Sequence, residues 1–242
     1  MSVTLETLKE VLCGADGSQG IIQDSSYYSG ITARINKAQR RIAAGIRMPK
    51  GTDSPGVVSP PLPGLLDTDT VDTATDAAYV SLPSDYQRNV IMVADSNGDQ
   101  IHPPKGGNYH SFDLFMKRAD IKDLTETGDI YIVCVTGSRL YYQGISSASK
   151  TLTLMFYRAP TDMSDDEDTV DGLPDHLAED LIKHYVARDI FGEGLEDSDE
   201  SRKTGYTYHS GRLYEVITDL IDFVGLPTEA VYYDTTGEDE EW

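Results

Sequence analysis

The chain has 242 residues, of which 39% are apolar and 25% charged, a composition that predicts one large domain or two small ones with real cores. Its 20 basic and 41 acidic residues give a formal net charge of −21, which argues against a protein that grips nucleic acid through the phosphates. The longest apolar run, residues 130–135, is far shorter than the roughly 20 residues needed to cross a bilayer.

We expect the protein to stay in a reducing compartment. Its first ten residues lack the basic leader, apolar stretch and small-residue cleavage site of a secretory signal, so the protein is predicted to be made and kept in a cytoplasm, or in something assembled there. Cys13 and Cys134 are too few and too far apart for a disulfide framework or a zinc knuckle. Both are therefore predicted to be buried thiols.

The chain begins with two predicted helices. Residues 4–13 place their apolar side chains on one side of a helix, with Thr4 as the N-cap. In residues 31–47 the apolar positions recur at spacings of four, three and four, and Pro49 enforces the end of this helix. Bases occupy its other faces, and three of them form a predicted basic face toward a neighbouring subunit: Arg34, Lys37 and Arg41.

The middle of the chain changes from proline-rich sequence to short apolar runs. Residues 49–77 are rich in Pro, Thr and Asp and are predicted to be a linker, or an arm that packs on a neighbouring subunit. Residues 78–160 alternate apolar and polar side chains between turns, which predicts a small antiparallel β-sandwich or barrel. Two hairpins are expected in it, with turns at residues 97–98 and 136–138.

A helical period returns in the C-terminal part. Residues 173–191 carry a broad apolar stripe that predicts a core helix. Residues 206–224 carry a second one, and Gly225 and Pro227 end it.

These elements predict an α+β protein with an inserted β domain. The helical core domain is expected to contain residues 1–48 and 161–226, and the β domain residues 78–160. Residues 227–242 are acidic and are predicted to be an extended tail. Three aromatic side chains are expected to anchor this tail on a partner: Tyr232, Tyr233 and Trp242.

No group of side chains stands out as a catalytic centre, so the chain is predicted not to be an enzyme and to use no cofactor. His176, Asp180 and His184 lie four residues apart on one helix and could present three metal ligands. No HExxH pattern or second ligand cluster accompanies them, so a solvated row beside the apolar stripe is the expected role, and no metal site is predicted.

Other motifs have equally plain interpretations. The segment from Asp95 to Asp99 has part of a calcium-loop pattern, but its glycine precedes the third ligand and Gly106 stands where the closing Glu is needed, so a hairpin turn is predicted. Phosphate-cradling glycine loops and G-x-S-x-G elbows do not occur. The 15 tyrosines beside a single Trp are typical of protein interfaces.

The order of parts resembles a family, the head-to-tail adaptor (connector) proteins of tailed bacteriophages. The resemblance covers most of the chain, roughly residues 5–225. Four segments carry it: Ile31–Ala43 on the early helix, Val80–Tyr86 entering the β part, Leu154–Pro160 leaving it, and Leu173–Tyr185 opening the third helix.

This resemblance implies a structural virion protein at the neck, the junction of head and tail. The family has a helical core split by a β insertion, forms a twelve-membered ring below the portal, and sends a C-terminal segment to a neighbouring ring. The implied partners are further copies of the chain, the portal protein, and tail or nozzle proteins. DNA would pass through the ring without specific binding, and no membrane is involved.

Two other classes of function stay open. Another virion structural role, as a tail terminator, a head-closure protein or a decoration protein, could use the β region to bind a shell. A metal- or carbohydrate-dependent enzyme, with a metal at His176 and His184, is the alternative from a different class.

Overall fold

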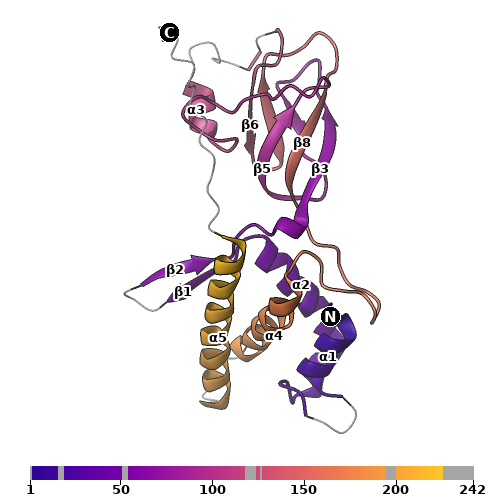
Figure 1. The fold of residues 1–242 in the computed structure, drawn as a ribbon, viewed down its shortest axis with the longest axis vertical. Coiled ribbons are helices and arrows are strands. Elements are labelled where there is room, and N and C mark those ends of the chain that lie inside the picture. Colours follow the sequence, from indigo (N-terminus) through magenta and orange to yellow (C-terminus); the bar gives the residue numbers. More distant parts are fainter. Residues whose placement is uncertain are drawn as a thin grey trace. The chain divides into compact units, whose positions relative to one another are not determined.

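The protein, shown in Figure 1 as a computed structural model, consists of two compact units. The structure describes residues 2–15, 19–50, 54–117, 124–125, 127–193 and 200–225. Met1–Leu65 and Ala159–Pro227 belong to one unit, here called the helical unit. Leu66–Arg158 belongs to the other, here called the β unit. The α+β class predicted from the sequence is confirmed.

Helices dominate the helical unit, and α4 lies at its centre because it contacts α1, α2 and α5. The elements are α1 (Leu5–Cys13), η1 (Ser25–Gly30), α2 (Ile31–Ala43), β1 (Arg47–Lys50), β2 (Ser54–Val58), η2 (Pro63–Leu65), α4 (Asp175–Gly192) and α5 (Glu200–Val224). The predicted N-cap is confirmed, since the Thr4 hydroxyl accepts a hydrogen bond from the Thr7 amide at 3.2 Å. The last helix begins at Glu200, six residues before the predicted start. The prediction began too late because the first turns of this helix carry no apolar stripe.

The apolar rows predicted on the helices form the core of this unit. Ile35 and Ile42 of α2 and Leu181 and Val186 of α4 are fully buried. None of the helices in the described parts of the chain is long and apolar enough to span a membrane.

Residues 49–77, predicted to be a linker or arm, contain regular structure instead. Strands β1 and β2 pair as an antiparallel hairpin in the helical unit. Leu62, between two prolines, and Leu65, just after the last of them, are buried in the core of that unit. The prolines mark turns between these short pieces, and the few apolar residues among them suffice to pack each piece in place.

The β unit is a sandwich of two three-stranded antiparallel sheets. Its elements are β3 (Leu66–Asp72), β4 (Tyr79–Ser81), β5 (Tyr86–Ala94), α3 (Phe112–Lys117), β6 (Ile132–Thr136), β7 (Arg139–Gln143) and β8 (Thr151–Arg158). The strand orders are β3-β8-β5 and β4-β7-β6. Leu154 and Phe156 of one sheet share a core with Val133 and Tyr142 of the other. Of the two predicted architectures, the sandwich is correct and the barrel is not.

Both predicted hairpins are confirmed, and the short helix α3 is an addition. The β6–β7 hairpin turns through Gly137, and the Asn97-Gly98 turn places Ala94 opposite Gln100. Helix α3 is too short for its period to show in the sequence. It packs on the outer side of β6, where Phe115 and Cys134 are fully buried.

The two cysteines differ in their surroundings. Cys134 is buried as predicted, and burial raises the pKa of its thiol to about 12. Cys13 is only half-buried, at the end of α1, so the prediction of a buried thiol is wrong for this residue.

Strand β3 lies at the edge of its sheet. Two of its aspartates accept hydrogen bonds from backbone amides of the same strand. The Asp67 carboxylate accepts a hydrogen bond from the Thr68 amide, and the Asp69 carboxylate one from the Thr70 amide, both at 2.7 Å. Because amides of alternate residues point to the same edge of a strand, these two carboxylates block one row of donors. The Asp-Thr repeat therefore shields the strand from pairing with another chain.

Candidate interaction surface

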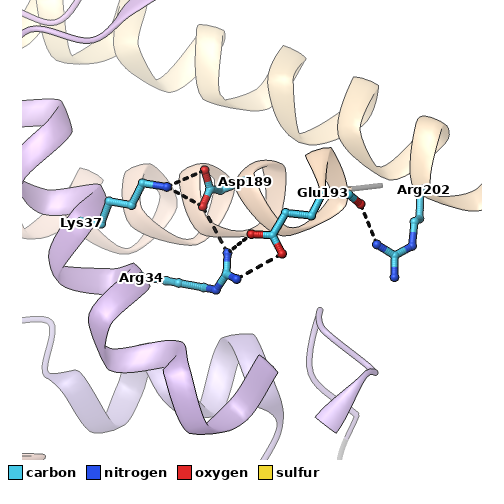
Figure 2. Close-up of polar contacts among 5 residues, drawn as sticks. All are labelled: Arg34, Lys37, Asp189, Glu193 and Arg202. Atoms are coloured by element: carbon cyan, nitrogen blue, oxygen red, sulfur yellow. Dashed lines mark hydrogen bonds and ion pairs between the residues drawn. The ribbon is translucent and has the colours of Figure 1, made fainter. Parts of the chain in front are cut away.

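The predicted basic face of α2 is engaged by acidic residues of the same chain, as Figure 2 shows. The Arg34 guanidinium donates to both carboxylate oxygens of Glu193, at 2.8 and 3.2 Å. It also donates to Asp189, at 3.2 Å. Lys37 donates to both oxygens of Asp189, at 2.9 and 3.0 Å. Arg34 and Lys37 thus form one ion-pair network with the end of α4.

The spacing of the residues explains this network. Arg34 and Lys37 are three residues apart on α2, and Asp189 and Glu193 are four apart at the end of α4, so each pair lies on one face of its helix. The last turn of α4 has no base of its own, and carboxylates near a helix C-terminus are unfavourable. The two α2 bases supply the missing positive charge.

Hydrogen bonds stabilise the charged form of Arg34 and connect Glu193 to α5. The hydrogen bond with Glu193 raises the pKa of Arg34, whose side chain is 23% exposed. Arg202 of α5 donates to the backbone carbonyl of Glu193 at 2.7 Å (Figure 2). The network therefore holds the ends of three helices together and has a structural role within the subunit.

Arg41, the third residue of the predicted face, has a different environment. It is exposed and forms no ion pair with the residues that the structure describes. Arg34 and Lys37 are thus brought together, whereas Arg41 stays available to another molecule.

Arg188 of α4 is a second base near Arg41 that the sequence interpretation did not identify. The Arg188 guanidinium lies 5.6 Å from the centre of the Tyr206 ring and has no carboxylate partner in the described part of the chain. Burial raises the pKa of the nearby Tyr185 phenol, and the charges of Lys37, Arg41 and Arg188 oppose this shift. The charges of Arg41 and Arg188 thus both act on Tyr185, and these two arginines are called the basic pair below.

The aromatic anchors predicted for the tail, Tyr232, Tyr233 and Trp242, lie outside the described residues. Their role stays a prediction.

The three side chains considered as metal ligands are drawn into separate contacts. The His176 ring lies 4.8 Å from the ring of Phe223, and Asp180 pairs with Lys183. The Nδ1 atom of His184 lies 2.9 Å from that of His209. Among the described residues, no three His, Cys, Asp or Glu side chains are grouped so as to hold a metal ion.

The segment from Asp95 to Asp99 is a hairpin turn, as predicted. The Asp95 carboxylate accepts hydrogen bonds from the Asn97 amide at 2.8 Å and the Asp99 amide at 2.9 Å. These bonds, that from Asp99 first, lower the pKa of Asp95. Gly98 takes the left-handed conformation that the turn requires, with a φ of 87°.

The chain was compared with known proteins. A comparison with curated proteins gave no match. The model of one protein family, described as SU10 adaptor protein, matches residues 13–225, which include all the described helices after α1, the sandwich and the charged surface described above. The chain therefore belongs to the SU10 adaptor protein family, and it is a phage adaptor protein.

Proposed function

We propose that identical copies of this chain form a ring of twelve between the portal and the tail of a tailed phage, and that DNA leaves the head through the centre of this ring. Membership of the adaptor family supports the location. The segregation of charge on the helical unit supports the ring. A closed ring of identical subunits needs two different faces on each subunit that complement one another.

The basic pair is the single observation that carries this proposal. Arg41 and Arg188 have no carboxylate partner among the described residues, although the chain has twice as many acids as bases. Bases that stay unpaired in so acidic a protein are suited to the acidic face of another copy. Arg34 and Lys37 would support this face indirectly, because they fix the helix that carries Arg188.

The net charge of −21 suits a channel through which DNA moves. A wall rich in carboxylates repels the phosphates of DNA, so the genome would slide past without binding. The protein would line the channel for DNA and connect the portal to the tail, and it would not act as an enzyme.

The tail supplies the contact with the portal in this proposal. Residues 227–242 combine acidic side chains with Tyr232, Tyr233 and Trp242, and large aromatic residues are the commonest anchors of protein interfaces. Tail or nozzle proteins would bind the opposite end of the ring. The proposed location is the neck of the virion, after assembly in the host cytoplasm.

Light scattering of the purified full chain, alone and mixed with its portal, tests the ring. We expect a mass of twelve subunits, reached by the chain alone or on the portal. A ring of six would favour a tail terminator instead. A monomer under both conditions would contradict the proposal.

Deleting residues 228–242 tests the proposed role of the tail. The truncated protein is expected to keep its circular dichroism spectrum and to lose attachment to the portal. Full attachment by the truncated protein would show that the anchor lies elsewhere.

A further inference from the structure

The outward face of helix α5 is not covered by any described part of the chain. The buried residues of α5 lie on one side: His209, Leu213, Val216, Ile217 and Leu220. The opposite side carries a row with spacings of three and four: Thr204, Tyr208, Gly211, Glu215, Thr218 and Asp222. Tyr208 in this row is 59% exposed. We call this row the outer face of α5.

Gly211 lies at the middle of the outer face, and no described residue packs so closely there that a glycine is needed. No described atom outside its own helix lies within 4 Å of the position that a Cβ would take. Gly205 on the same helix is different, because a Cβ there would lie 2.8 Å from the Phe191 ring. A glycine inside a helix is less favourable than alanine, so Gly211 weakens α5 without improving any contact of its own subunit. Its useful property is that another chain can approach the backbone closely there.

The charges on and beside the outer face indicate which chain that is. Asp219 and Asp222 are exposed and form no ion pair with any described residue. The helical unit also has the complementary feature, the basic pair Arg41 and Arg188, on helices α2 and α4. Arg212, which lies beside the outer face, already pairs with Glu215 of that face, at 2.6 Å.

From these observations we infer that the outer face of α5 is the surface on which the basic pair of a second copy docks, with Gly211 at the point of closest approach. This inference rests on the proposed ring and names the two faces that build it. One copy contributes the acidic outer face and the next copy contributes Arg41 and Arg188. Such a contact joins two different faces, so it propagates from copy to copy around a ring.

A larger side chain at Gly211 tests the close approach. Gly211→Gln should keep the fold, because glutamine favours a helix and the site is open. The protein concentration at which half of the chains are assembled, measured by native mass spectrometry, should rise at least about tenfold. Glu10→Gln, at an exposed position of α1, is the control and should assemble like the unchanged chain. If Gly211→Gln fails to fold, Gly211→Ala, measured in the same way, replaces it.

Charge reversal identifies the partner of the outer face. Asp219→Lys combined with Asp222→Lys should abolish assembly, Arg41→Glu should weaken it, and the three changes together should restore much of it. Such restoration requires that the two faces meet in the assembly.

The outcomes separate this inference from the proposed function. A ring that forms normally with Gly211→Gln and with the aspartate reversals overturns the inference and leaves the ring intact. Normal rings that no longer bind the portal would assign the outer face to the portal, which also overturns it. An unchanged chain that never assembles, alone or on the portal, contradicts both.

Discussion

The imidazole rings of His184 on α4 and His209 on α5 meet in a hydrogen bond between their Nδ1 atoms, 2.9 Å apart. One Nδ1 must carry a proton and the other must accept it, so the bond requires that at least one ring is neutral. Both side chains are buried, and the Phe191 ring stacks on His209 at 5.5 Å. The pair joins α4, which carries Arg188, to α5, which carries the outer face.

We predict that the helical unit loses stability between about pH 6.5 and pH 4 because of this pair. Burial, then the charge of His209, lowers the pKa of His184 to about 4 from 6.5, and burial, then Lys183, lowers that of His209. As the pH falls, the unfolded chain takes up protons that the folded chain does not, so unfolding becomes more favourable. The loss is at most about 1.4 kcal/mol per pH unit for each ring.

Urea unfolding at several pH values measures this effect. The variant His184→Gln with His209→Gln should show a smaller pH dependence between pH 6.5 and pH 4 than the unchanged chain. His176→Gln, at an exposed position of the same helix, is the control and should not alter the slope. Equal slopes in all three proteins would show that groups other than this histidine pair dominate the pH dependence.

The ion-pair network of α2 should contribute measurably to folding. Arg34→Met is expected to lower the free energy of unfolding by about 1 kcal/mol, the upper end for a partly exposed pair, since the bond to Glu193 is bidentate. Arg41→Met is the matched control, because Arg41 is the same residue type on the same helix without an ion pair in the described chain. Thermal unfolding that ranks the two variants equally would contradict the structural role of the network.

Two glycines of α5 should respond oppositely to alanine. Gly211→Ala is expected to stabilise the subunit by roughly 0.5 to 1 kcal/mol, because its Cβ meets open space. Gly205→Ala is expected to destabilise it, because its Cβ would lie 2.8 Å from Phe191. Chemical denaturation under conditions that keep the chain monomeric compares them. A loss of stability in Gly211→Ala would reveal an internal contact at that position.

The aspartates on β3 should keep the chain soluble. Asp69→Val removes the carboxylate that binds the Thr70 amide and leaves an apolar edge, so we expect aggregation at neutral pH, seen as turbidity on mild heating. Asp129→Val, at an exposed loop position of the β unit, makes the same substitution as a control. Similar turbidity of the two variants would mean that the loss of charge alone is responsible.

The sequence was most informative where a single period dominates. The spacing of Ile31, Ile35 and Ile42 predicted α2, and the Asn97-Gly98 pair predicted a hairpin, because both features depend on residues close in the chain. Strand β3 was missed because its repeat of Asp and Thr resembles a linker, and only pairing with β8, far along the chain, makes it a strand.

The candidate surface shows the same limit. Spacing on α2 identified Arg34, Lys37 and Arg41 as one face, but their separation into paired and unpaired bases depends on Asp189 and Glu193, more than 140 residues later. The sequence interpretation did not single out Arg188, which directly precedes Asp189. In the structure Asp189 binds the α2 bases instead.

The position of the protein in the assembled virion tests the central claim most directly. Electron micrographs of virions that carry a bulky label on this chain should show twelve labels around the path by which DNA leaves the head, between portal and tail. Labels on the shell, at the far end of the tail, or away from the DNA path would contradict the account.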